Sequence, residues 1–132
     1  MARAGKHKTV QATDADLRAR LARASGHLEL ARNGEGSQDR NAVASAHILA
    51  AIAAADVICG KLTGEYNRST DHAEAARLLT RAGEKESAND LNRILRQKNI
   101  AQYAGTLLSE ADAKQVGRLA EKLVARALEL LA

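Results

Sequence analysis

Apolar residues recur through most of the chain at three- and four-residue spacing, the pattern of helices that bury one face. The first such stripe is formed by Leu17, Leu21, Ala24, Leu28 and Ala31, and the last by Val116, Leu119, Ala120, Leu123, Ala127 and Leu130. Thr13 with Asp16, and Ser109 with Asp112, have the spacing of capping boxes ahead of these stripes. We therefore expect the first and last helices to begin beside Thr13 and Ser109.

The stretch from Asn41 to Gly60 is apolar around its whole circumference and almost uncharged. It predicts a central helix covered on more than one side, capped by Ser37 or Asp39. Asp56 is the exception within it, because a carboxylate in apolar surroundings requires a partner. We expect that partner on the fourth predicted helix, where the candidates are Arg93, Arg96, Lys98 and the hydroxyl of Tyr103.

Two more helices are predicted between the central and the last one. A short third helix begins at Ser69 or Thr70, and a fourth is capped by Ser87 with Asp90 and ends at Gly105. The whole pattern predicts an all-α fold, an antiparallel bundle of four to five helices. With 2% aromatic residues and no proline, the composition fits closely packed helices, and we expect no strands. Residues 13–132 should form one domain after a flexible basic arm, residues 1–12.

The composition limits both the expected cellular compartment and the kinds of site that the chain can form. The longest apolar run, Ile48 to Ala55, has eight residues and is too short to cross a bilayer, and the start of the chain lacks the apolar stretch of a signal peptide. We expect a soluble cytoplasmic protein without membrane contact. The net charge of +4 mildly favours an anionic partner. No cysteine and histidine spacing fits zinc and no glycine-rich phosphate loop occurs, so no cofactor or metal is expected.

Polar residues of the fourth predicted helix form a row at spacings of three and four. The row is Asn92, Arg96, Asn99 and Tyr103. It fits a hydrogen-bond network, a subunit interface or an anion site in which Arg96 binds phosphate. A solvated helix edge is the structural alternative. A second basic row, Lys114, Arg118, Lys122 and Arg126, is expected to be a solvated face and alternatively to contact phosphates.

Three stretches of the chain resemble the HEPN family of prokaryotic helical proteins. They are ADVICG in the central helix, DHAEAARLL at the start of the third and ILRQKNIAQYAG in the fourth. The resemblance spans about Asp14 to Leu131 and implies a bundle of four to five helices that pairs into a symmetric homodimer. Many members are metal-independent ribonucleases, often toxins paired with a nucleotidyltransferase antitoxin, whereas others are noncatalytic nucleotide-binding or scaffold domains.

The catalytic members carry an arginine followed, after four to six residues, by a histidine in the helix that matches the fourth one here. From Arg96 those positions are Ala101, Gln102 and Tyr103, and from Arg93 they are Lys98, Asn99 and Ile100. None is histidine, so the resemblance implies a degenerate ribonuclease motif. Tyr103 matches a tyrosine that a nucleotidyltransferase partner AMPylates in some toxin members.

The leading hypothesis is therefore a HEPN-like domain that binds a protein partner, RNA or a nucleotide. The expected binding residues are Asn92, Arg96, Asn99, Tyr103, Asp56 and His72. The alternative is a metal-independent endoribonuclease of toxin-antitoxin type, in which Arg96 and Lys98 stabilise phosphate and Tyr103 or a distant histidine acts as the base. Arg40 and His47 have the motif spacing on the central helix and are a second catalytic pair. A structural scaffold is the third hypothesis.

Overall fold

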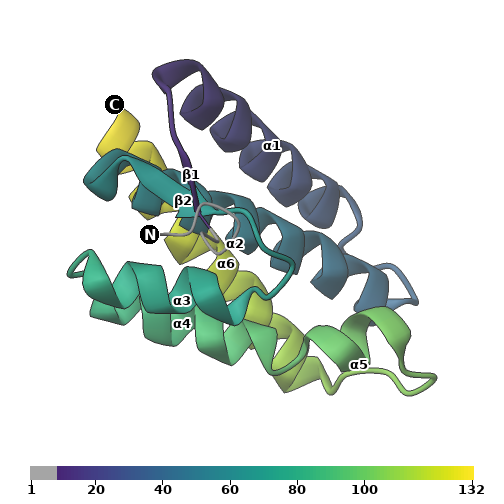
Figure 1. Ribbon diagram of the computed structural model, residues 1–132. Coiled ribbons are helices and arrows are strands. Elements are labelled where there is room, and N and C mark those ends of the chain that lie inside the picture. Colours follow the sequence, from purple (N-terminus) through teal and green to yellow (C-terminus); the bar gives the residue numbers. More distant parts are fainter. Residues whose placement is uncertain (1–8) are drawn as a thin grey trace.

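The structure of the chain, a computed structural model, describes residues 9–132, and residues 1–8 of the predicted arm lie outside that range (Figure 1). Most of the described residues are helical, which confirms the predicted all-α class. The elements in chain order are β1 (Thr9–Gln11), α1 (Asp14–Asn33), α2 (Arg40–Thr63), β2 (Glu65–Asn67), α3 (Ala73–Arg81), α4 (Lys85–Leu95), α5 (Lys98–Tyr103) and α6 (Glu110–Leu131).

Helix α2 is the centre of the bundle, as its all-round apolar surface predicted. It contacts α1, α3, α4, α5 and α6, and Figure 1 shows it running through the middle of the molecule. By length and composition α2 would suffice to cross a membrane, although the apolar run alone suggested otherwise. Most of it is buried inside the bundle, as in the core helix of a soluble protein.

Side-chain caps define three of the helix starts. The hydroxyl of Thr13 accepts from the Asp16 backbone N–H, and that of Ser109 accepts from the Asp112 N–H, so both predicted caps are confirmed. Asp39 caps α2 by accepting from the N–H groups of Asn41 and Ala42. These contacts satisfy N–H groups that have no partner inside a helix.

The predicted start of the fourth helix is wrong. Helix α4 begins at Lys85, one turn earlier than expected. The Ser87 hydroxyl donates to the Glu84 carboxylate, and Asp90 forms an ion pair with Lys122. Both side chains are thus engaged elsewhere than in the predicted cap.

The expectation of no strands is also wrong. Strands β1 and β2 pair antiparallel with Val10 opposite Tyr66, and the Ala12 N–H donates to the Gly64 carbonyl at 2.8 Å. Gly64 ends α2 in the left-handed conformation, with φ of 84°, which turns the chain back beside β1. Residues 9–11 of the predicted arm are therefore part of the folded domain.

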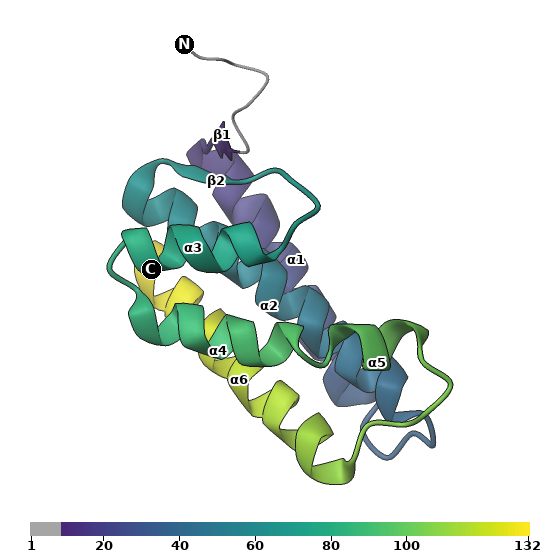
Figure 2. The ribbon, with the colours of Figure 1, turned by 60° about the horizontal axis from the view of Figure 1, so that its bottom comes forward.

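The predicted fourth helix is broken into α4 and α5, with Arg96 and Gln97 in the turn between them. Figure 2 shows α5 beside the first turns of α2. Two side chains of α2 hold it there: Asn41 donates to the Ile100 carbonyl at 3.1 Å, and Ser45 donates to the Ala101 carbonyl at 3.3 Å. The predicted polar row from Asn92 to Tyr103 therefore does not lie along one helix.

The second basic row, from Lys114 to Arg126, does not form a single solvated face either. Lys122 lies 2.7 Å from Glu86 and 2.9 Å from Asp90, and Arg126 donates two hydrogen bonds to Glu84. These pairs join α6 to α4. Two of the four basic side chains thus have a structural role between helices.

Candidate binding pocket around Asp56

Asp56 lies in the interior of the bundle, where only 6% of it is exposed. Its Oδ2 is 3.1 Å from Nη1 of Arg20 on α1. The Nη2 of Arg20 donates to the Tyr66 hydroxyl at 3.1 Å, and the guanidinium lies 4.1 Å from the centre of the Tyr66 ring. Arg20 therefore has a carboxylate partner and an aromatic one at the same time.

The expectation that Asp56 has a partner is confirmed, but the predicted partner is wrong. Arg93 and Arg96 are exposed, and Arg96 lies in the turn between α4 and α5. Helix α1 packs along α2 instead, and Arg20 extends inward beside the apolar stripe of α1. A long arginine side chain can cover apolar surface while its charged end reaches a buried partner.

A cavity of about 390 Å³ opens beside this ion pair. Its volume lies in the range of small-molecule sites, roughly 300 to 1,000 Å³. The lining residues come from α1, α2, β1, β2 and the segment before α3, and are Val10, Arg20, Ile52, Asp56, Tyr66, Asn67, Arg68, Ser69 and His72. We call this cavity the Asp56 pocket. It brings together two predicted binding residues, Asp56 and His72.

Burial raises the pKa of Asp56 to about 7, while the positive charge of Arg20 acts in the opposite direction. A carboxyl group with this pKa is partly protonated at neutral pH. It can donate a hydrogen bond in one form and accept hydrogen bonds in the other. Strongly shifted groups beside a cavity are characteristic of functional sites.

His72 is half-buried and lines the same pocket. Burial lowers the pKa of His72, and the nearby positive charge of Lys98 lowers it further, against the opposing effect of Asp71. The imidazole is therefore mainly neutral at pH 7, with one donor and one acceptor nitrogen. Lys98 also lies 5.7 Å from the centre of the Tyr103 ring, but neither residue lines the pocket.

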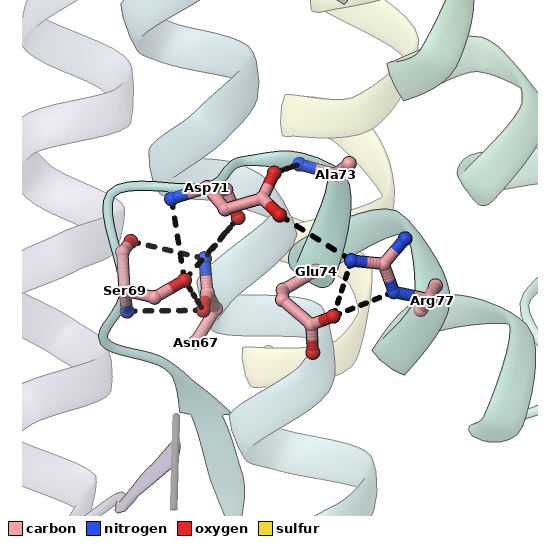
Figure 3. Close-up of polar contacts among 6 residues, drawn as sticks. All are labelled: Asn67, Ser69, Asp71, Ala73, Glu74 and Arg77. Carbon is pink, nitrogen blue, oxygen red and sulfur yellow. Dashed lines mark hydrogen bonds and ion pairs between the residues drawn. The ribbon is translucent and has the colours of Figure 1, made fainter. Parts of the chain in front are cut away.

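A network of side chains fixes the backbone that carries His72 (Figure 3). The Asn67 Oδ1 accepts from the Ser69 N–H at 3.1 Å and the Ser69 hydroxyl at 2.9 Å, while its Nδ2 donates to the carbonyls of Ser69 and Asp71. The Asp71 carboxylate accepts from the Ala73 N–H at 3.0 Å. Helix α3 therefore starts at Ala73, rather than at the predicted Ser69 or Thr70, because residues 67–71 are held in a non-helical turn.

The other predicted site residues do not join this pocket. Asn92, Arg96 and Asn99 are exposed, and within residues 9–132 their side chains form no hydrogen bond. Tyr103 is 76% exposed. Arg40 and His47 line a different groove, between α2 and α6.

Five polar residues of the pocket were not among the predicted site residues: Arg20, Tyr66, Asn67, Arg68 and Ser69. Tyr66 offered a signal, since it is one of two tyrosines in a chain without phenylalanine or tryptophan, and a lone aromatic residue in a polar segment is worth noting. Arg20 directly precedes Leu21 of the apolar stripe, and therefore lies at the edge of the buried face.

The fold defines a mostly helical bundle with one small antiparallel sheet among residues 9–132. Comparison of the chain with protein-family models, with curated proteins and with solved structures finds no match. The geometry of the Asp56 pocket is therefore the basis for the function that we propose below.

Proposed function

We propose that this chain is a HEPN-like cytoplasmic domain that binds nucleotides, free or within RNA, at the Asp56 pocket. The observation that carries the proposal is a buried carboxyl group, with a pKa of about 7, that pairs with an arginine and lines a cavity together with a histidine. Burial of these groups carries a desolvation cost that apolar residues of the same volume would not have. Packing alone therefore does not explain their presence.

The groups that line the pocket match the chemistry of a nucleotide. The planar guanidinium of Arg20, supported by the Tyr66 ring, is a surface on which a base can stack. Asp56, Asn67 and His72 supply donors and acceptors for the edge of a base. The exposed Arg68 lines the same pocket and can bind a phosphate.

A calorimetric titration tests this function with a ribonucleoside monophosphate and a short RNA in separate arms. We expect saturable binding to the wild-type protein. The affinity should fall about tenfold or more in His72→Ala and in the double variant Arg20→Met with Asp56→Asn, which is the effect of losing one good charge-assisted contact. The double variant removes both charges of the ion pair, so no unpaired charge is left in the core. Arg23→Met, an exposed arginine of the same helix, is the matched control.

The two arms separate the sources of the nucleotide. Binding of the monophosphate assigns the pocket to free nucleotides, and binding of RNA alone assigns it to RNA. Absence of binding in both arms, or equal binding by the double variant, contradicts the proposal. The RNA is also analysed for cleavage: strand scission that is lost in His47→Ala or Arg40→Ala would make the chain an endoribonuclease instead.

The proposal includes a symmetric homodimer and a nucleotidyltransferase-like partner. Large apolar side chains are exposed on α2 and along and after α5, namely Leu49, Ile100, Tyr103 and Leu107, and such side chains support an interface. Tyr103 is also accessible to an enzyme that would modify its hydroxyl.

A further inference from the structure

A second cavity, of about 810 Å³, lies between α2 and α6 and does not share a residue with the Asp56 pocket. We call it the α2–α6 groove. Its lining includes Glu35 and Arg40 near the start of α2, His47 on α2, and Glu110, Lys114, Gly117, Arg118 and Glu121 on α6. Figure 2 shows the α1–α2 connection and the start of α6 at the same end of the molecule.

His47 lines this groove although only 7% of the residue is exposed. Its Nδ1 is buried and has no hydrogen-bond partner among residues 9–132. Such unpaired polar atoms are rare in folded proteins because a lost hydrogen bond costs about 1 to 3 kcal/mol. The imidazole therefore has hydrogen-bonding capacity that residues 9–132 do not use.

Gly117 leaves space for the imidazole. A Cβ atom at this position would lie 3.0 Å from Cε1 of His47 and 3.3 Å from each ring nitrogen. Glycine inside a helix costs roughly 0.5 to 1 kcal/mol relative to alanine. Its presence in the middle of α6 thus accommodates the polar edge of the His47 ring at the wall of the groove.

The groove lining combines three cationic side chains, Arg40, Lys114 and Arg118, with three acidic ones, Glu35, Glu110 and Glu121. Glu110 lies 3.9 Å from Lys114, and Glu121 lies 3.4 Å from Arg32, so two of the three acidic residues already have cationic partners. Arg40 uses its Nε to donate to the Leu108 carbonyl at 3.1 Å. Within residues 9–132, no carboxylate pairs with Arg40 or Arg118, which leaves two guanidinium groups available in one cavity.

We propose that the α2–α6 groove is a second, independent anion site that binds a phosphate group between Arg40 and Arg118, with the His47 imidazole as a hydrogen-bond partner. Arginine matches the geometry of phosphate oxygens and provides several parallel donors. A neutral imidazole supplies one further donor. Burial lowers the pKa of His47 and favours that form, against the opposing negative charges of Glu121 and Glu35. The ligand is thus inorganic phosphate or a phosphomonoester, and the two sources share this chemistry.

Nitrogen NMR of the His47 imidazole tests the site with inorganic phosphate as the probe and a ribonucleoside 5′-monophosphate in a second arm. We expect the His47 resonances to shift in a saturable manner with phosphate in the wild-type protein. The shift should fall at least fivefold in Arg118→Gln, an exposed position whose substitution leaves the core unchanged. Arg93→Gln, an exposed arginine of α4, is the matched control and should behave as wild type.

Two further variants keep this site distinct from the Asp56 pocket. Asp56→Asn should leave the His47 response to phosphate intact, whereas Gly117→Ala should reduce it because the added methyl group displaces the ring. A larger response to the nucleotide than to phosphate would identify a phosphomonoester as the ligand. A response that does not saturate, that persists in Arg118→Gln, or that disappears in Asp56→Asn would overturn the proposal.

Discussion

At the scale of single residues, Asp56 is subject to two opposing electrostatic effects. Removal from water favours its neutral form, whereas the guanidinium of Arg20 favours its charged form. Because Arg20 is one-third exposed, water screens its charge and burial has the larger effect. The result is a carboxyl group that changes its charge near neutral pH.

This balance predicts how stability depends on pH. Asp56 has a pKa of about 7 in the fold and 3.8 as a free side chain. Between these values the folded chain keeps a proton that the unfolded chain has lost, so the free energy of unfolding should fall as pH rises from about 4 to about 7, by roughly 4 kcal/mol. Urea unfolding of the wild-type protein and Asp56→Asn across this range measures it.

The Asp56→Asn variant tests whether ionisation of Asp56 lowers or raises stability. Asp56→Asn removes the titrating group, so it should gain stability relative to wild type as pH rises to about 7, with no further change above that value. Asp14→Asn, at an exposed position of α1, should show no such trend. A variant that instead loses stability relative to wild type over this range would mean that the attraction to Arg20 outweighs burial.

The sequence indicated that Asp56 needs a partner, since the charge stands in an apolar helix, but it did not indicate which one. That depends on which helix presents an arginine beside this part of α2, and the expected partners on the fourth helix were wrong because Arg20 of α1 fills that place. The fold also places Tyr66 in a strand pair that no sequence pattern signalled, since each strand has only three residues. Strands this short depend on the surrounding tertiary contacts.

At the scale of elements, Asn41 organises the segment from α5 to α6. Its Nδ2 donates to the carbonyls of Ile100 and Thr106 at 3.1 and 2.9 Å, and its Oδ1 accepts from the Leu108 N–H at 2.8 Å. This one buried side chain satisfies three backbone groups, one in α5 and two in the irregular segment between α5 and α6. It explains why α5 bends away from α4 although neither glycine nor proline marks the break.

Asn41→Ala should therefore destabilise the domain by about 2 kcal/mol or more, because the buried Leu108 N–H and two partly buried carbonyls lose their partner. Amide hydrogen exchange should accelerate most in α5 and at Leu108. Asn89→Ala, an exposed position of α4, is the control and should change stability by less than about 0.5 kcal/mol. Equal stability of the two variants would show that the Asn41 contacts do not hold α5 in place.

Three helix starts and the central helix were predictable because local chemistry determines them, whereas the starts of α3 and α4 were not. The caps at Thr13, Asp39 and Ser109 need only a side chain and N–H groups within the first turn. The break between α4 and α5 was not predictable, since its cause lies in Asn41 and Ser45, more than fifty residues earlier. Long-range hydrogen bonds of this kind leave no periodic signal in the segment that they bend.

At the scale of the whole molecule, the exposed apolar residues on α2 and around α5 are the reason to expect a homodimer rather than a monomer. We expect sedimentation analysis to give twice the chain mass of 14.0 kDa. Tyr103→Glu should shift the protein towards monomer, because a charge at the centre of an interface costs desolvation energy. Leu30→Glu, at an exposed apolar position of α1, is the control. A wild-type protein that sediments as a monomer at high concentration would contradict the dimer.

The direct test of the central claim is the pKa of Asp56, measured by carboxyl-carbon NMR with and without a saturating ribonucleoside monophosphate. We expect a pKa of about 7 in the free protein and a higher one in the complex, because the negative phosphate disfavours the ionised carboxyl group. A pKa at or below the ordinary value of 3.8, unchanged when the nucleotide is added, would contradict it.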